Sequence, residues 1–505
     1  MTLPTATPAE TGVDPAALAR TITELAARGT ELHGIVVLRH GQVIAAGEAD
    51  PWTSDQIRLV YSLSKTFCSA AVGIAVDQGC FGYDDRVVDL LPDLVDEQVG
   101  PVMRQVRVRD LLAMASGHQH DVNNDLLGWN DPSSDPGRGG LGEAQLAQFL
   151  RVEPTGTPGV TFEYNQPCTW TLSRLVARYA GRDVLDLLTE HVFGPLGLPT
   201  PYWARDSDGV PLGFSGLHTT TAVAAAFFQL ILDRGIHNGV RLLPAAWADQ
   251  HAQRHVATAP TGRTGDWSLG YGWQVWQCQH GYRGDGAFGQ YGLVLPEQDL
   301  VVAITSWSPD MQTTLDVIWS ELLPGVDREP TPGGDEALAQ ALAGLKVPTA
   351  GAGWPEQPET ASWEGGDNHG NRLSLTAGAD HASLEWTDDT GAQHRVEAGP
   401  DRWVPGRLAW GERWLAVSTS AAYGPGGWTL RMAILHTPHL VTWTLPAGSA
   451  QATIAWNVPP IGPVRVHQLA EPFPAHGGSR SAHGCTGRVS GRSLRARAPA
   501  RQGYS

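Results

Sequence analysis

The sequence has few lysines and cysteines and lacks any long apolar run. Of its 35 basic residues, only Lys65 and Lys346 are lysines. Its 5 cysteines are scattered and form no CxxC pair, so a disulfide framework is disfavoured and a reducing compartment is expected. No apolar stretch reaches the roughly 18 residues that a membrane-spanning helix requires. We therefore expect neither disulfide bonds nor a membrane span.

Several signatures of common protein classes are also missing. The sequence contains no GxSxG elbow, which disfavours an α/β-hydrolase, and no Walker P-loop. The N-terminus has neither the basic region nor the apolar stretch of a secretory signal, so we expect a cytoplasmic protein. The formal net charge of −17 opposes binding to nucleic acid or anionic lipid. A small molecule is the expected partner, and the sequence does not indicate the oligomeric state.

The chain of 505 residues, 42% of them hydrophobic, is long enough for several folded domains. Helical and strand patterns are mixed over residues 1–324, where we expect an α+β domain. A Pro/Gly-rich linker with one short helix is expected over 325–358. Short β runs then recur at intervals of about ten residues, which predicts a small all-β sandwich or barrel over 359–471. A disordered basic tail is expected over 472–505.

Hydrophobic periodicity predicts individual elements within the first domain. An amphipathic helix capped by its first residue is expected over Asp14–Arg28, followed by a hairpin of His33–Arg39 and Gln42–Gly47. A second helix is expected over Thr219–Arg234. Gly292–Ser306 is expected to form two strands around a Pro-Glu-Gln-Asp turn.

The segment Tyr61-Ser-Leu-Ser-Lys-Thr-Phe carries the strongest chemical signal. Ser62 and Lys65 are three residues apart, so both project from one face at the start of a helix. A lysine amine can take the proton of a serine hydroxyl when burial lowers its pKa, whereas an arginine cannot lose its proton. Backbone N–H groups at the helix N-terminus would stabilise an oxyanion. The alternative interpretation makes Ser62 a simple N-cap.

A tyrosine occupies the centre of a second candidate segment, Phe162-Glu-Tyr-Asn-Gln. A phenol can relay a proton between a serine, a lysine and a leaving group, so Tyr164 is a candidate catalytic residue. The alternative interpretation is a half-buried core tyrosine.

The segment Gly284-Asp-Gly-Ala-Phe-Gly matches GxGxxG in form. A dinucleotide fingerprint requires a helix after the glycines, but Tyr291-Gly-Leu-Val-Leu has the pattern of a strand, so we reject nucleotide binding. A glycine-rich entry to a strand can instead present N–H groups to a substrate carbonyl. The alternative interpretation is a plain turn.

The segment Ser116-Gly-His-Gln-His-Asp resembles the HxHxDH motif of metallo-hydrolases. Val122 and Asn123 occupy the positions where that motif requires Asp and His. We therefore interpret these histidines as loop residues, and we expect neither a metal nor another cofactor.

Taken in order, these segments resemble the serine β-lactamase and penicillin-binding-protein superfamily. The resemblance is closest to its class C-like, esterase and 6-aminohexanoate-oligomer-hydrolase branch, and covers roughly residues 8–323. It implies a five-stranded antiparallel sheet flanked by helices, with the active site between the sheet and a helical region. Further segments that resemble the family are Val37-Leu-Arg-His-Gly-Gln, Val108-Arg-Asp-Leu-Leu-Ala-Met-Ala-Ser-Gly-His, Ser215-Gly-Leu-His-Thr-Thr-Thr and Gly270-Tyr-Gly-Trp.

The resemblance also implies roles for individual residues. Ser62 is similar to the acylated nucleophile, Lys65 to its base and Tyr164 to the tyrosine of the YxN motif. Backbone N–H groups of Ser62 and of the closing strand would hold the oxyanion. The expected oxyanion and substrate-binding residues are Ser62, Gly286, Ala287, Phe288 and Gln166.

Two positions depart from the family pattern. Gln166 stands where YxN has asparagine, and Asn165 lies one residue early. Asp285-Gly-Ala replaces the usual KTG or HxG motif, with His280-Gly281 as a rival register. An aspartate in place of a cation should weaken binding of a substrate carboxylate, such as that of a β-lactam.

These observations lead to one functional hypothesis and two alternatives. We expect a serine hydrolase that cleaves a small ester or amide through an acyl-enzyme on Ser62, with acid–base catalysis by Lys65 and Tyr164. The first alternative is a β-lactamase or D-amino-acid peptidase. The second is a non-catalytic member of the same fold that binds ligands.

Overall fold

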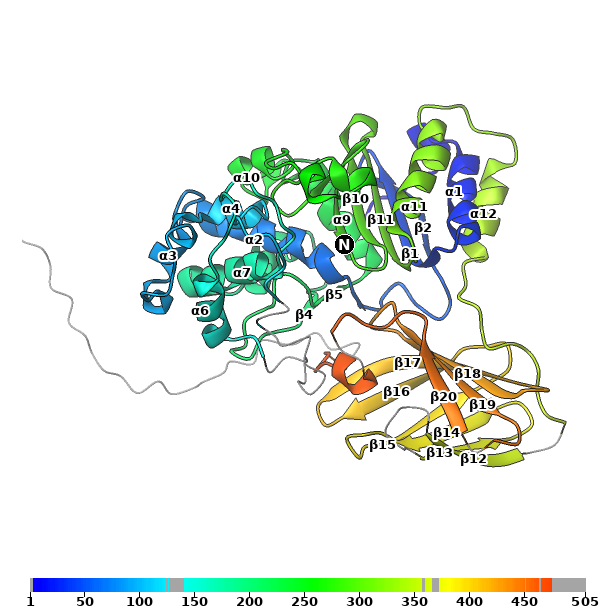
Figure 1. Ribbon diagram of the computed structural model, residues 1–505. Helices are drawn as coiled ribbons and strands as arrows, with labels where there is room; N and C mark the ends of the chain where they lie inside the picture. The colour runs from blue at the N-terminus through cyan, green and yellow to red at the C-terminus, as the bar shows by residue number, and fades with distance from the viewer. Residues whose placement is uncertain are drawn as a thin grey trace, which may run out of the picture. The chain divides into compact units, whose positions relative to one another are not determined.

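The structure, a computed structural model, contains an α+β region followed in the chain by an all-β region (Figure 1). It describes residues 3–123, 126, 140–356, 359–365, 372–449, 451–462 and 465–474. Residues 1–472 form one compact unit and residues 473–505 a second. The disordered tail expected over 472–505 lies almost wholly outside the described residues. The expected fold class, an α+β fold with a C-terminal all-β part, is confirmed.

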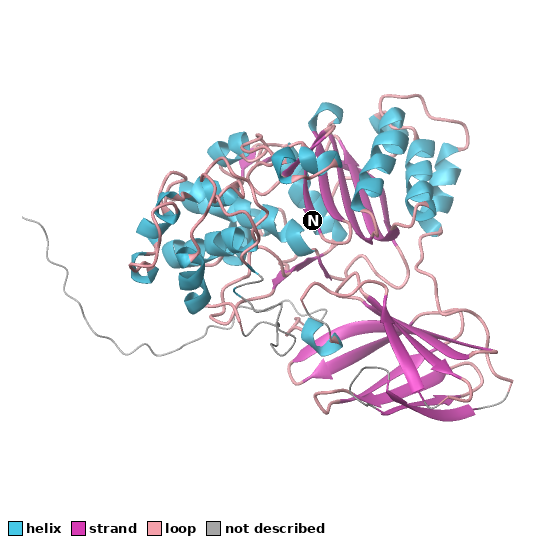
Figure 2. Cartoon of the chain, viewed as in Figure 1, coloured by secondary structure: helices cyan, strands magenta, loops and turns pink. Residues whose placement is uncertain are grey.

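An antiparallel sheet of six strands forms the centre of the α+β region (Figure 2). The strand order is β2-β1-β11-β10-β9-β8. The sheet has one strand more than the family resemblance implied, and the edge strand β8 has only three residues. The strands are β1 (Glu31–Arg39), β2 (Gln42–Glu48), β8 (Trp276–Cys278), β9 (Gly281–Gly286), β10 (Gln290–Leu295) and β11 (Leu300–Trp307).

Helices cover both faces of this sheet. Successive side chains of a strand point to opposite faces, so Val36 and Leu38 of β1 join one hydrophobic cluster while Ile35 and Val37 join another. The first cluster includes α2 and α9, and the second includes α1, α11 and α12. The α-helices in the described part of the chain are α1 (Pro15–Ala27), α2 (Ser64–Asp77), α3 (Val87–Leu90), α4 (Val108–Leu112), α6 (Glu143–Arg151), α7 (Gln166–Ala180), α8 (Val184–Leu188), α9 (Thr221–Leu232), α10 (Ala245–Gln250), α11 (Met311–Val317) and α12 (Gly334–Ala343). None of these described helices combines the length and the apolar character needed to cross a membrane.

The elements predicted for the first domain are present with small shifts at their ends. Asp14 caps α1, since its Oδ1 accepts a hydrogen bond from the Ala16 N–H at 3.0 Å. The predicted hairpin is β1 and β2, and the helix predicted from Thr219 is α9, which Thr220 caps. The two strands predicted over Gly292–Ser306 are β10 and β11. These predictions are confirmed.

A nine-stranded sheet forms the all-β region. Its order is β15-β14-β13-β12-β20-β19-β18-β17-β16, with β12 and β20 parallel and the other neighbours antiparallel. The end strands β15 and β16 also contact each other, so the sheet curls toward closure as in a barrel. The predicted domain boundaries stay a prediction. The strands are β12 (Glu359–Gly365), β13 (Arg372–Ala377), β14 (Ala382–Thr387), β15 (Gln393–Ala398), β16 (Val404–Trp410), β17 (Arg413–Gly424), β18 (Gly427–Ile434), β19 (Leu440–Pro446) and β20 (Gln451–Trp456).

Two small sheets complete the α+β region. One pairs β6 (Ile236–His237) with β7 (Val240–Arg241). The other has the order β3-β5-β4, formed by Arg58–Leu59, Leu217–Thr219 and Tyr202–Trp203. Since β3 ends three residues before Ser62, this three-stranded sheet positions the segment with the strongest chemical signal.

Candidate active site

The segment around Ser62 is anchored at β3 and continues into α2. The buried Arg58 guanidinium of β3 donates to Glu48 Oε2 at 2.5 Å and to Thr305 Oγ1 at 2.6 Å, which ties β3 to the central sheet. Residues 61–63 form a 3-10 turn, η2 (Tyr61–Leu63), and α2 begins at Ser64. The N-cap position of α2 is Leu63, so the interpretation of Ser62 as its N-cap is wrong. Ser62 is half-buried and lies in η2, two residues before the first residue of α2.

Lys65 lies in the first turn of α2 and is only 1% exposed. Its Nζ is 3.0 Å from Ser62 Oγ, 2.6 Å from Gln166 Oε1 and 2.8 Å from the Phe214 carbonyl oxygen. Burial lowers the pKa of Lys65 to about 7, although the carboxylates of Asp121 and Asp285 act in the opposite direction. A substantial fraction of this amine is therefore neutral at neutral pH.

The three neighbours of Lys65 orient the neutral amine. A neutral amine has two N–H donors and one lone pair. The carbonyl oxygens of Gln166 and Phe214 can only accept, so they take the two N–H groups. The lone pair then faces the remaining neighbour, Ser62 Oγ, whose hydroxyl proton it can accept.

Tyr164 completes the group around Ser62. Its ring stacks on Trp276 at a centroid distance of 5.4 Å, and Lys65 Nζ lies 4.7 Å from the ring centroid. Burial and the nearby Asp285 raise the pKa of Tyr164, while its hydrogen bond with Ser62 acts in the opposite direction. The phenol therefore keeps its proton at neutral pH and can act as a proton donor beside Ser62.

Gln166, which departs from YxN, contacts Lys65 directly. α7 begins at Gln166, so the side chains of Gln166 and of the N-cap residue Asn165 point in different directions. Asn165 is fully buried, and its Oδ1 accepts a hydrogen bond from the Val122 N–H at 3.1 Å. The structure thus places the Gln166 amide, and not that of Asn165, at the amine.

The Gly286-Ala287-Phe288 turn between β9 and β10 packs against η2. A Cβ on Gly286 would lie 2.1 Å from the carbonyl oxygen of Val60, and the Phe288 ring meets the Tyr61 ring edge-on at 5.3 Å. The carbonyl of Ala287 accepts from Gln290 Nε2 at 3.3 Å, and that of Phe288 accepts from the Ser308 N–H at 2.9 Å. Both carbonyls thus accept hydrogen bonds from protein donors.

The two rival registers of the third motif lie at opposite ends of β9. Asp285 lies near the end of β9, is buried, and accepts from Arg283 Nε at 3.1 Å. Burial raises the pKa of Asp285, while Arg283 and Lys65 act in the opposite direction. His280 precedes β9 and contacts the Trp319 ring at 5.0 Å. Asp285 is thus the residue beside Lys65, and its charge is paired with Arg283.

The histidine-containing loop contributes one residue to this group. His118 is buried and bonds Ser116 Oγ at 2.9 Å and the Val152 carbonyl at 3.0 Å, as expected for a loop histidine. Asp121 differs, because its Oδ1 accepts from the backbone N–H of Gln166 at 3.1 Å and its charge acts on Lys65. Asp121 therefore supports the residue that binds the amine.

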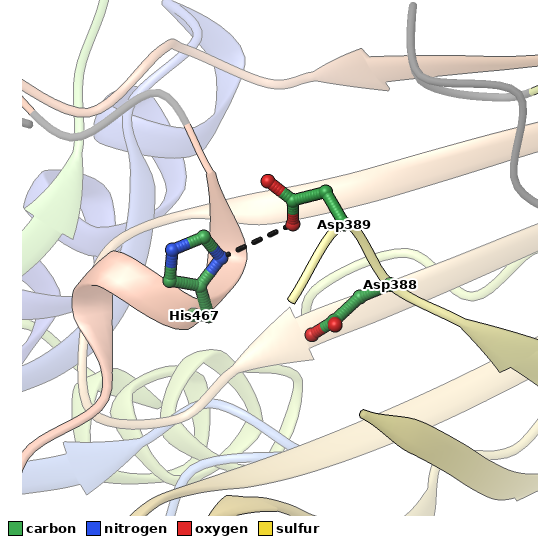
Figure 3. A group of neighbouring side chains, drawn as sticks. All are labelled: Asp388, Asp389 and His467. Atoms are coloured by element: carbon green, nitrogen blue, oxygen red, sulfur yellow. Dashed lines mark ion pairs between the residues drawn. The ribbon is translucent and has the colours of Figure 1, made fainter. Parts of the chain in front are cut away.

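Figure 3 shows Asp388, Asp389 and His467, whose ligand atoms lie within 4.8 Å of one another in the all-β region. Protein partners already satisfy these groups. Asp388 Oδ2 accepts from Trp410 Nε1 at 2.5 Å, and Asp389 pairs with Arg465 and with His467 Nδ1 at 3.4 Å. Because Arg465 supplies the positive charge that a cation would bring, we interpret this cluster as structural.

A comparison with protein families identifies the class to which the chain belongs. The Beta-lactamase family model matches residues 18–317, which is more than half of the chain. The chain therefore belongs to the beta-lactamase family and is a hydrolase of that family. The family resemblance seen in the sequence is confirmed.

Individual relatives are more distant. The chain is similar to the 6-aminohexanoate-dimer hydrolase of Paenarthrobacter ureafaciens, with 26% identity over 334 residues, 61% of this chain and 81% of the relative. Among solved structures, it is similar to an octameric penicillin-binding protein homologue from Pyrococcus abyssi, with 13% identity, a TM-score of 0.48 and coverage of 84% of this chain and 97% of the other. A D-stereospecific amidohydrolase from Streptomyces sp. is 18% identical with a TM-score of 0.46, covering 61% of this chain and 99% of the other.

The structure brings together Ser62, Lys65, Tyr164 and Gln166 and packs the glycine-rich turn against the segment that carries the serine. Three further contributors were missed in the sequence. The Phe214 carbonyl carries no signal of its own, since every residue has one. Trp276 and Asp121 reach the site only through the fold, although Asp121 belongs to the segment that resembles the HxHxDH motif.

Proposed function

We propose that the chain is a serine hydrolase that cleaves a small ester or amide through an acyl-enzyme on Ser62. The observation that carries this proposal is the contact of 3.0 Å between Lys65 Nζ and Ser62 Oγ, made by a fully buried amine. A buried amine with a pKa of about 7 is suited to general-base catalysis near neutral pH.

In the proposed acylation, the neutral Lys65 amine takes the Ser62 hydroxyl proton as Oγ attacks the substrate carbonyl carbon. The new C–O bond converts the carbonyl into a tetrahedral oxyanion. Backbone N–H groups of Ser62 and of the Gly286–Phe288 turn would hold this charge. When the intermediate collapses, the bond to the leaving group breaks. The Tyr164 phenol donates a proton to the leaving group and regains one from the Lys65 ammonium.

In the proposed deacylation, water attacks the acyl carbonyl while a proton passes from the water to the Lys65 amine. Collapse of the second tetrahedral intermediate breaks the Ser62 Oγ–carbon bond and releases the carboxylic acid. Ser62 Oγ takes the proton back from Lys65, which restores the starting state. Only groups of the chain and one water molecule take part in this cycle.

The charges around Lys65 support a small ester or amide over a β-lactam. Asp285 occupies the third motif and is paired with the buried Arg283, so this position offers no free cation for a substrate carboxylate. A relative named 6-aminohexanoate-dimer hydrolase also supports a small amide. The β-lactamase or D-amino-acid peptidase alternative is addressed by adding nitrocefin and D-alanyl peptides to the substrate panel.

The test is covalent labelling by a fluorophosphonate probe, read by intact-mass spectrometry. We expect one probe adduct on the unmodified protein and none on Ser62→Ala, which should also lose hydrolysis of p-nitrophenyl esters. Ser116→Ala is the matched control, since Ser116 forms a buried serine–histidine pair with His118 and should not affect labelling. Equal labelling of folded Ser62→Ala, or no labelling of the unmodified protein, would overturn the proposal.

A further inference from the structure

The all-β region reaches the residue directly before Ser62. The Tyr61 hydroxyl lies 2.5 Å from Nε2 of His439, the residue directly before β19. Both side chains are buried, and His439 is 0% exposed. His439 is 378 positions from Tyr61 in the sequence, yet it contacts this residue, which directly precedes the proposed nucleophile.

The direction of this hydrogen bond follows from the second nitrogen of His439. Nδ1 lies 3.0 Å from the Val458 carbonyl oxygen, which can only accept, so Nδ1 carries the proton. Nε2 of the neutral ring is then an acceptor, and the Tyr61 hydroxyl donates to it. Burial lowers the pKa of His439 to about 3 and raises that of Tyr61, so both groups stay neutral at neutral pH.

His439 also contacts the proposed oxyanion turn. Its ring meets the Phe288 ring edge-on at 5.3 Å and the Tyr61 ring at 5.9 Å, while the latter two rings meet at 5.3 Å. The three rings form a closed cluster. One member precedes Ser62, and another belongs to the turn whose N–H groups would face the oxyanion.

Two members of this cluster, Tyr61 beside Ser62 and Phe288 in the proposed oxyanion turn, have strained backbones. Tyr61 has a φ of 48° and Phe288 a φ of 68°, in the left-handed region that residues with a Cβ rarely adopt. Such conformations persist only where the surroundings enforce them. Hydrogen bonds hold the Tyr61 carbonyl to Ser64 Oγ at 2.5 Å and the Phe288 carbonyl to the Ser308 N–H at 2.9 Å. His439 adds contacts to both side chains from the all-β region.

Neighbouring contacts fix the position of His439 itself. The Leu59 N–H donates to the His436 carbonyl at 2.8 Å, and Trp52 Nε1 donates to the Leu435 carbonyl at 3.1 Å. The backbone N–H of His439 donates to Thr437 Oγ1 at 3.1 Å. The segment from residue 435 to 439 is thus held against the strand that leads to Ser62.

We propose that His439 is a positioning residue of the hydrolase, which holds Tyr61 and Phe288 so that Ser62 and the oxyanion turn face the substrate carbonyl together. This inference rests on the proposed function. His439 exchanges no proton with the substrate. Its contribution is geometric, and small displacements of reacting groups reduce turnover strongly.

The test compares steady-state ester hydrolysis by His439→Ala, Tyr61→Phe and the double variant. We expect kcat to fall by about 10- to 100-fold in each single variant, with KM changed by less than about 3-fold. Because both variants break the same contact, the double variant should lose little more than either single one. His439→Gln keeps an acceptor at a similar reach and should recover part of kcat.

His394→Ala is the matched control. His394 is also a buried histidine of the all-β region, and it bonds Asp388 Oδ2 at 2.9 Å without contacting the Ser62 segment in any described interaction. Folded His394→Ala should have the same kcat as the unmodified protein. If His439→Ala fails to fold, the kcat of Tyr61→Phe, which lacks only the hydroxyl that contacts His439, tests the inference by itself.

Unchanged kcat in folded Tyr61→Phe, or a change confined to KM, would overturn the inference. Failure of the proposed function is recognised separately, because hydrolysis would then persist in Ser62→Ala. Additive losses in the double variant would likewise contradict a shared positioning role, since independent effects add.

Discussion

Lys65 acquires its chemistry from its surroundings and not from its identity alone. Lys346, the other lysine of the chain, is exposed, and its backbone forms an isolated β-bridge with Asp50. Lys65 is buried against two carbonyl acceptors and a serine hydroxyl, and burial brings its pKa to about 7. An arginine at this position would remain protonated and could not act as a base.

This pKa predicts the pH dependence of hydrolysis. The neutral amine is the active form, so activity should be lost as pH falls through the pKa of Lys65 near 7. We expect kcat/KM to fall about tenfold per pH unit on the acid side and to level off above about pH 8. The measurement is kcat/KM for a neutral ester between about pH 5 and pH 9.

Circular dichroism at each pH controls for unfolding. A flat profile across neutral pH would show that Lys65 is not the base.

A Lys65→Met variant should lose at least about 1,000-fold in kcat, because the nucleophile would then lack its proton acceptor.

At the residue level, the sequence could predict which residues form the site, but not where their side chains point. Ser62, Lys65 and Tyr164 were predicted as a group, and the structure places them together. The sequence could not show that Gln166 would turn to Lys65 while Asn165 turned to Val122, because this depends on where α7 begins. Nor could it show that Arg283 would pair with Asp285 from the same strand.

At the scale of elements, the candidate site depends on how closely η2 approaches β9. Only a glycine permits this approach, since a Cβ on Gly286 would lie 2.1 Å from the Val60 carbonyl oxygen. Backbone atoms cannot move aside as a flexible side chain can. The strand therefore fixes the distance between the Ser62 segment and the turn that follows Gly286.

A methyl group at this position should separate the two elements. We expect Gly286→Ala to lower kcat by at least about 10-fold and to destabilise the fold by about 1–3 kcal/mol. Urea denaturation and ester hydrolysis measure the two effects. Gly424→Ala, at the end of β17, is the control, because a Cβ there meets no atom within 4 Å. Equal behaviour of the two variants would contradict the steric argument.

The sequence predicted elements well where the periodicity was strong. The helix at α1 and the strands β10 and β11 have clear periods and turn residues, and their positions are confirmed. The three-residue strand β8 is too short to show a period. In the all-β region the pattern predicted short strands but not their pairing, because tertiary contacts determine such short segments more than local pattern does.

At the scale of the whole molecule, the α+β and all-β regions share a hydrophobic core. Trp52 is 3% exposed, and its indole bonds the Leu435 carbonyl, while Trp403 Nε1 donates to the Val347 carbonyl at 3.2 Å. The sequence predicted separate domains from local patterns and composition, which carry no information on such long-range contacts. The buried members of this shared core are Ala49, Trp52, Val347, Trp403, Ala433, Leu435 and Leu440.

A shared core should make the two regions unfold together. We expect a single cooperative transition in differential scanning calorimetry of the full chain, because separating the regions would expose Trp52 and its neighbours. Trp52→Ala should cost about 3–5 kcal/mol and divide the transition into two. Trp247→Ala, a change of equal size in the interior of the α+β region, should lower the melting temperature without dividing the transition. Two resolved transitions in the unmodified chain would show that the regions are energetically independent, and His439 would then depend on a weakly held partner.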